Sequence, residues 1–351
     1  MKLVLHIGTP KTASTLLQNS CEGNPDWLSR HGLAYGRALA PDANHITLFF
    51  AAAIAIHDLT RAYGIHTLDE LADFRTRLIA EIRSCRDAQP AHIHTMIYST
   101  ENLTGNLRSP EGVEQLREML APLFDTVEIV VYIRRQDDAI LSMYGEFMRR
   151  GFSEAPFSRF MENCLSEKSP VPYIFYRREL EKWIKVWGRE TITVRVFDRK
   201  EFIGGQILTD FMSVVLGRTD FDMSDFQASP ADNRGLSAPV LEALRRLQPS
   251  IPFMKGDRPN PVREMLLPFI NTLPTEPRPV MAAERAGKIM AYFEASNLWV
   301  KDTFFPGRAG PLFAPRPDHP DVGNMGLLDI DQFAEISARL LTAICDPSGR
   351  L

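Results

Sequence analysis

A lysine among small hydroxyl residues near the N-terminus is the first group in this sequence whose residue types and spacing suit chemistry on an anion. Lys11 precedes the run Thr12-Ala13-Ser14-Thr15. An ammonium group and short hydroxyl donors bind phosphate or sulfate oxygens well. If a helix begins here, its unpaired backbone N–H groups and its dipole add to that attraction. The stretch predicts an anion site, and an ordinary strand–loop–helix connection with a solvated lysine is the alternative.

A second group of this kind lies further along the chain. Arg134 ends an apolar run, and Ser142 follows it eight residues later, which is about two turns of a helix. A guanidinium fork and a hydroxyl together suit a phosphate monoester. The alternative is that Arg134 and Arg135 are surface arginines paired with Asp137 and Asp138.

Alternating strands and helices must position these residues. Short apolar, β-branched runs predict strands, at 3–7, 94–98, 127–133 and 191–197, with an extended piece at 32–36. Helices are predicted from residue 16 and at 46–62, 68–88, 111–124, 136–149, 179–186 and 205–216. This order predicts an α/β fold with a mainly parallel sheet covered on both faces. Ligands of such sheets bind at the carboxyl ends of the strands.

The composition changes near residue 218, where prolines become frequent. We therefore predict a core at 1–217 and a mainly helical cap at 218–351 that packs on the core and is not independent. The clearest helices of the cap are expected at 236–247, 282–293 and 330–344.

Composition excludes several other classes. The formal net charge is -4, which argues against a nucleic-acid binder. The four cysteines are far apart and form no CxxC pair, so reduced thiols are expected and no metal site is predicted. The N-terminal apolar run is too short for a signal peptide. The longest later one, 46–56, is too short to span a bilayer, so no transmembrane segment is predicted and the cytoplasm is the expected location.

The first group of residues resembles the loop that binds the 5′-phosphosulfate in sulfotransferases using 3′-phosphoadenosine 5′-phosphosulfate (PAPS). That loop has a pattern close to PK[ST]G[ST][ST], and this chain has Pro10-Lys11-Thr12-Ala13-Ser14-Thr15. Ala13 stands where glycine is usual, and alanine fits if its φ is negative. A Walker A loop is a poorer match, because Lys11 follows Gly8 by only three residues and Pro10 precedes the lysine.

The second group is similar to the sulfotransferase motif for the 3′-phosphate of PAPS, in which a serine follows a strand-ending arginine by eight residues. Further likeness to bacterial carbohydrate-type sulfotransferases lies around 183–202, 210–217, 232–237 and 297–313. The resemblance implies a P-loop-like three-layer core, PAPS as co-substrate, adenosine 3′,5′-bisphosphate as product, and no required metal. It also implies a small-molecule or glycan acceptor, with a carbohydrate hydroxyl as the expected target.

The resemblance further suggests roles for single residues. Lys11 would stabilise the leaving phosphate oxygen, with Thr12, Ser14 and Thr15 around the 5′-phosphate. Transfer to a hydroxyl needs a base. Glu101, after the strand at 94–98, is the first candidate.

His45 is the second candidate for the base. Each candidate also has a structural alternative: Glu101 as a helix cap or ion-pair partner, and His45 as a packed or capping histidine. Arg234 could reach the 3′-phosphate from the cap, or it could be a solvated loop arginine. Three aromatic residues are available to stack on adenine: Tyr144, Trp183 and Trp187.

Two other functions remain open from the sequence. One is an ATP-dependent small-molecule or sugar kinase on a P-loop core, although the glycine–lysine pair and a clear acidic magnesium ligand are missing. The other is a non-catalytic nucleotide-binding protein on the same scaffold.

Overall fold

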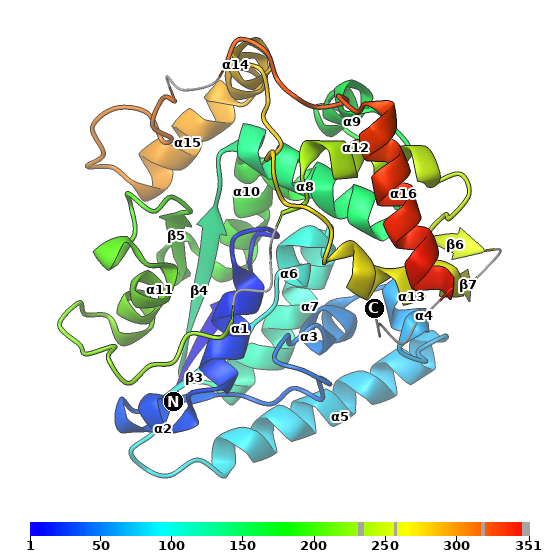
Figure 1. Ribbon diagram of the computed structural model, residues 1–351. Helices are drawn as coiled ribbons and strands as arrows, with labels where there is room; N and C mark the ends of the chain where they lie inside the picture. Colours follow the sequence, from blue (N-terminus) through cyan, green and yellow to red (C-terminus); the bar gives the residue numbers. More distant parts are fainter. Residues whose placement is uncertain (231–234, 256–257, 317–319, 346–351) are drawn as a thin grey trace. The chain divides into compact units, whose positions relative to one another are not determined.

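The computed structural model describes residues 1–230, 235–255, 258–316 and 320–345, and Figure 1 labels their helices and strands. The chain groups into two compact units, and neither is one continuous stretch. Unit 1 comprises residues 1–134, 175–230 and 296–313. Unit 2 comprises the described residues of 135–174, 231–295 and 314–351.

Unit 1 is built on a five-stranded parallel sheet with the strand order β2-β3-β1-β4-β5. The strands are β1 (Lys2–His6), β2 (Leu33–Tyr35), β3 (Thr95–Ser99), β4 (Thr126–Ile133) and β5 (Ile192–Val196). The predicted α/β class is confirmed, and the strand ends differ from the predicted ones by one residue or so. Because β1 is central, the loop that leaves it lies between the loops that leave β3 and β4.

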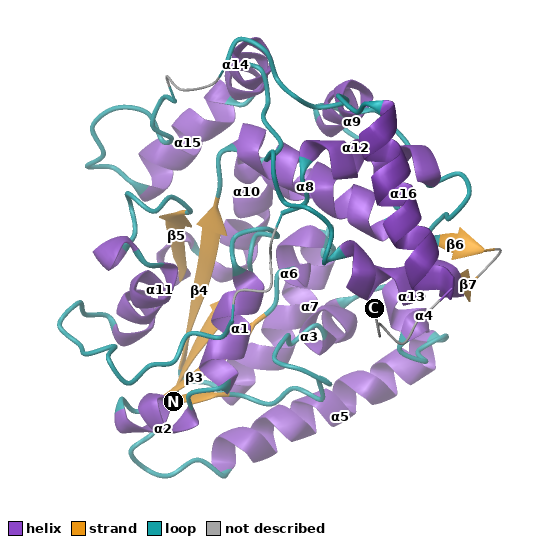
Figure 2. Cartoon of the chain, viewed as in Figure 1, coloured by secondary structure: helices purple, strands orange, loops and turns teal. Residues whose placement is uncertain are grey.

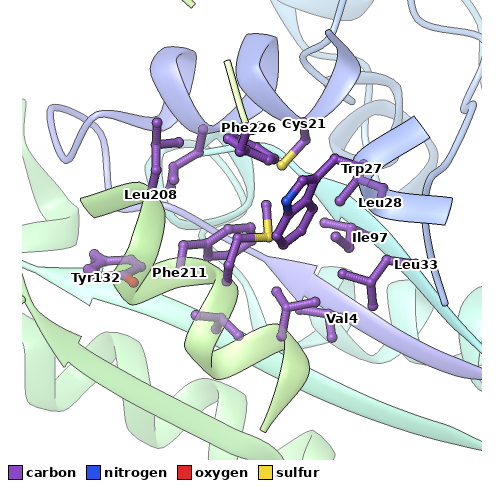
Figure 3. Packing of buried hydrophobic residues seen from close by; sticks show 14 of the residues in the cluster. Val4, Cys21, Trp27, Leu28, Leu33, Ile97, Tyr132, Leu208, Phe211 and Phe226 are labelled. Carbon is purple, nitrogen blue, oxygen red and sulfur yellow. The ribbon is translucent and has the colours of Figure 1, made fainter. Parts of the chain in front are cut away.

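Helices cover the sheet of unit 1, and Figure 2 shows strands and helices in different colours. They are α1 (Ser14–Glu22), α2 (Pro25–Arg30), α3 (Thr47–Ala52), α4 (Asp58–Ala62), α5 (Leu68–Asp87), α6 (Asn102–Gly105), α7 (Pro110–Leu120), α10 (Tyr176–Trp187), α11 (Ile207–Leu216) and most of α15 (Glu294–Phe304). Figure 3 shows Val4 and Ile97 of the sheet packed with Cys21 of α1 and Phe211 of α11. Successive residues of β1 are buried on both faces, which explains why the strands read as unbroken apolar runs.

The helix predicted at 68–88 is present as α5. Its start is fixed by a capping box, in which Thr67 accepts from the backbone of Glu70 and Glu70 accepts from the backbone of Thr67. The four buried residues of α5 are spaced three or four apart and so form one apolar stripe: Leu71, Phe74, Leu78 and Ile82.

The prediction of a single helix over 46–62 is wrong, because the chain forms the two short helices α3 and α4 there. Ala53 ends α3 in an extended conformation, with ψ of 139°. His57 then starts α4 by accepting the Leu59 N–H with its ring.

Unit 2 is mainly helical and is centred on α8, which packs against α9, α12, α13 and α14. Its elements are α8 (Gln136–Arg150), α9 (Phe157–Cys164), α12 (Ala238–Leu247), β6 (Met254–Lys255), β7 (Arg258–Pro259), α13 (Pro261–Ile270), α14 (Ala283–Tyr292) and α16 (Ile330–Cys345). Gly151, with φ of 82°, ends α8. The buried Arg263 guanidinium donates to the Arg149 carbonyl at 2.6 Å, which satisfies a carbonyl at the end of this helix.

Candidate functional site

The loop between β1 and α1 is held tightly against β4. The Gly8 carbonyl accepts from the Tyr132 N–H at 2.8 Å, and Thr9 donates to the Tyr132 carbonyl with both its N–H and its hydroxyl, each at 3.0 Å. The Thr12 hydroxyl then donates to the Thr9 carbonyl at 2.5 Å. These bonds fix the backbone from residue 8 to residue 12 and so position Lys11.

A set of unused donors lies at the start of α1. The backbone N–H groups of residues 12–16 have no acceptor among the residues that the structure describes. The Ser14 hydroxyl is buried and has no partner in the same part of the chain. Buried polar groups are rarely left unpaired, and successive N–H groups in such a turn form an anion-binding hollow. The geometry therefore suits a bound anion.

Ala13 corrects one expectation. Its φ is 62° and its ψ is 26°, so the residue is left-handed and the condition of a negative φ is not met. Alanine has a Cβ that disfavours this conformation, and glycine would adopt it freely.

Arg134 lies beside the loop. Its guanidinium donates to the Lys11 carbonyl at 3.2 Å and lies 5.6 Å from the centre of the Phe197 ring. The Arg134 N–H donates to the Tyr176 hydroxyl at 3.1 Å, and that hydroxyl donates back to the Arg134 carbonyl. The structure therefore brings together two segments 123 residues apart, with Tyr176 holding the end of β4.

Tyr176 was not identified from the sequence. It opens α10 without any motif around it, so no local signal could have revealed its role.

The other residues of the second motif lie in unit 2. Arg135 forms an ion pair with the buried Asp137 at 2.9 Å, as the alternative expected, but its side chain is only 11% exposed and so does not lie on the surface. Ser142 is half-buried on α8. Its joint action with Arg134 stays a prediction, and Arg234 lies outside the described residues.

Glu101 directly follows β3 and lies against the start of the loop. A Cβ placed on Gly8, whose φ is 96°, would lie 2.8 Å from the Glu101 Cα, so glycine is needed there. The Glu101 carboxylate accepts from the Gln18 amide at 3.0 Å and from the Asn44 amide at 3.3 Å. It makes no ion pair with any residue in the described ranges, and its side chain does not cap α6.

Gln18 and Asn44 were also missed from the sequence. The Asn44 side-chain oxygen is buried without a donor among the described residues. A hydrogen-bond acceptor beside the carboxylate is thus unused.

His45 has both ring nitrogens engaged by the backbone. Nδ1 accepts from the Ser99 N–H at 2.9 Å, so Nε2 carries the proton and donates to the Gly36 carbonyl at 2.9 Å. Burial lowers the pKa of His45 to about 4. The ring is neutral as a base requires, but the Ser99 N–H already occupies its lone pair.

The three aromatic residues considered for adenine are all buried in the structure. Tyr144 is 1% exposed, Trp183 0% and Trp187 8%. Tyr144 packs edge-on against Phe157 and Phe160. None of these three aromatic rings therefore has a face that is accessible to adenine.

The described residues contain neither a membrane-spanning helix nor a cluster of metal-ligating side chains. No helix there is long and apolar enough to cross a bilayer. No group of three or more histidine, cysteine, aspartate or glutamate side chains there could hold a metal ion.

Comparison with known proteins gives distant similarities. No family model matches the chain. An uncharacterised protein of Archaeoglobus fulgidus is 28% identical over 132 residues, which is 37% of this chain and 33% of that protein; the match thus spans about a third of the relative's length. A sulfotransferase structure from Alicyclobacillus acidocaldarius superposes with a TM-score of 0.41 and 15% identity, covering 65% of this chain and 86% of that one. The sulfotransferase domain of the Synechococcus PCC 7002 olefin synthase superposes with a TM-score of 0.33 and 10% identity, covering 76% of this chain and 93% of that domain.

Proposed function

We propose that the protein is a PAPS-dependent sulfotransferase that transfers a sulfuryl group to a hydroxyl, with a carbohydrate as the expected acceptor. PAPS supplies the sulfuryl group, and adenosine 3′,5′-bisphosphate is the second product. The observation that carries the proposal is the set of unused backbone donors at residues 12–16 with the unpaired Ser14 hydroxyl beside them. A phosphate in this hollow would satisfy those donors, and the helix dipole favours its negative charge.

Each residue of the loop would have a defined task. Lys11 would stabilise the negative charge that develops on the leaving phosphate oxygen. The backbone around Pro10 and Ala13, with the Thr12, Ser14 and Thr15 side chains, would surround the 5′-phosphate. Arg134 and Ser142 would bind the 3′-phosphate, with Arg234 as an additional cation.

Glu101 would act as the base. A bond forms between the acceptor oxygen and sulfur, the bond from sulfur to the phosphate oxygen breaks, and the acceptor proton moves to the Glu101 carboxylate. Support comes from the Gln18 and Asn44 amides, which orient this carboxylate without a neutralising cation among the described residues. The unused Asn44 oxygen could accept a hydrogen bond from a second hydroxyl of the acceptor.

Ligand binding is the first test. We expect adenosine 3′,5′-bisphosphate to raise the melting temperature far more than ADP or ATP, because a ligand at 100 times its Kd stabilises the folded state by about 2.7 kcal/mol. Stabilisation by ATP with magnesium alone would indicate the kinase alternative. Binding of the bisphosphate without transfer from PAPS to any hydroxyl of a glycan panel would indicate a non-catalytic protein.

Variants then test the roles. Lys11→Ala should abolish transfer, and Arg134→Ala should weaken bisphosphate binding by about 10- to 100-fold, as expected for a lost charge-assisted hydrogen bond. Glu101→Gln should lower kcat by about 10²- to 10⁴-fold with binding retained. The matched control is Lys200→Ala, which removes an exposed cation. Unchanged turnover in both Lys11→Ala and Arg134→Ala would refute the proposal.

A further inference from the structure

A second feature of unit 1 suits an anion and shares no residue with the loop. It is a cavity of about 320 Å³ lined by residues of α10 and of the start of α7, two helices that pack together. Its lining contains four cationic and two acidic side chains, in the set Arg108, Pro110, Arg178, Glu179, Glu181, Lys182 and Lys185. Figure 1 shows the two helices that form it.

The floor of this cavity is an internal ion pair. The Lys182 ammonium is buried and donates to the Glu179 carboxylate at 2.7 Å and to the Leu107 carbonyl at 2.6 Å. These two charges offset each other, so the floor adds little net charge. It instead fixes α10 against the segment that leads into α7.

The rim carries the other three cationic side chains of the lining and one carboxylate. Glu181 is paired with Arg177, at 2.8 Å. Arg108 and Lys185 are exposed and form no ion pair with any residue in the described part of the chain. Glu111, in the exposed first turn of α7, is the nearby carboxylate: its pKa is lowered by its own backbone N–H, then by the Ser109 hydroxyl, and least by Lys185.

Arg178 completes the rim. Its guanidinium lies 4.5 Å from the centre of the Phe175 ring, and its Nε is 3.9 Å from Glu179. The aromatic ring supports the planar guanidinium, which is a common arrangement for this group.

We infer that this cavity binds a small organic molecule through a phosphate or sulfate ester. Two arginines and a lysine around one opening suit a tetrahedral oxyanion, and the start of α7 adds a favourable dipole. The volume is near the lower end of the usual range for small-molecule sites, about 300–1,000 Å³. The lining of the cavity shares no residue with the contacts that Arg134 makes with Lys11 and Tyr176. The inference is independent of the proposed function.

Binding measurements test it directly. Isothermal titration at low salt would use glucose 6-phosphate and glucose 6-sulfate as probes, with glucose as the uncharged control. We expect the esters to bind and glucose not to bind. The double variant Arg108→Ala/Lys185→Ala should weaken ester binding at least tenfold. The charge-matched control, Arg199→Ala/Lys200→Ala, removes two other exposed cations and should leave binding unchanged.

A third variant, Lys11→Ala, separates this cavity from the loop. Ester binding that survives Lys11→Ala but not Arg108→Ala/Lys185→Ala supports the inference, whether or not the protein uses PAPS. Ester binding that Lys11→Ala removes, equal loss in both double variants, or no ester binding at all would overturn it. A sulfated oligosaccharide that binds more tightly than glucose 6-sulfate would identify an extended acceptor as the source of the ester, and equal affinity would identify a free metabolite.

Discussion

Replacing Ala13 with glycine is expected to stabilise the protein. A residue with a Cβ pays about 1–2 kcal/mol in the left-handed conformation, which Ala13 adopts with φ of 62°. Glycine removes this cost but increases the entropy of the unfolded chain, which is worth about 0.4–1 kcal/mol. The net gain in the free energy of unfolding is therefore about 0.5–1 kcal/mol.

Ala72 provides a matched control. It is exposed within α5, so the same substitution there should cost about 0.5–1 kcal/mol. One chemical change thus has opposite signs at the two positions, with a gap of about 1–2 kcal/mol.

Urea unfolding followed by tryptophan fluorescence is the assay. All four tryptophans lie in unit 1, as do Ala13 and Ala72, so the signal reports on the unit that is changed. If Ala13→Gly destabilises the protein as much as Ala72→Gly does, the left-handed backbone is not a source of strain and the reasoning fails.

Two other perturbations test buried polar groups of unit 1 by the same assay. Burial lowers the pKa of His6 to about 3 and that of His45 to about 4, whereas both are near 6.5 when unfolded. Stability should be complete above pH 6.5 and fall by about 1.4 kcal/mol per pH unit per histidine as the pH drops towards 4, because the unfolded state binds more protons. A His45→Asn variant should show a shallower decline, and an equal slope would contradict this assignment. Separately, Asp210→Asn should cost about 3 kcal/mol, because the fully buried carboxylate accepts from the Tyr132 hydroxyl and pairs with Arg195. A loss below about 1 kcal/mol would show that Arg195 does not need this partner.

The local pattern of apolar and polar residues was sufficient to predict most helices and strands. The run at 127–133 predicted β4 because a strand covered on both faces is mostly apolar. The stripe of α5 was equally readable, since one helical face has to be buried. The helix predicted at 46–62 failed because no glycine or proline near Ala53 signals the break, and the ring of His57 unexpectedly caps the second helix.

The sequence pattern predicted only part of the candidate site. Lys11 and Arg134 each follow a strand, so their placement at the carboxyl edge of a parallel sheet follows from the fold class. Glu101 follows a strand as well, and the structure places it against Gly8. The roles in binding and transfer remain proposals for all three residues.

Periodicity and chain order are local properties, so the residues alone indicated the α/β class, the order of the strands and the three strands that Lys11, Glu101 and Arg134 follow. The contacts of each side chain became known only from the fold. Both ring nitrogens of His45 are hydrogen-bonded to the backbone of Gly36 and Ser99. The Tyr176 hydroxyl is hydrogen-bonded to the backbone of Arg134, and Ala13 has a left-handed backbone conformation. Such partners come from segments distant in sequence, or from backbone angles that the closure of the loop imposes. Neither leaves a trace in the spacing of residue types.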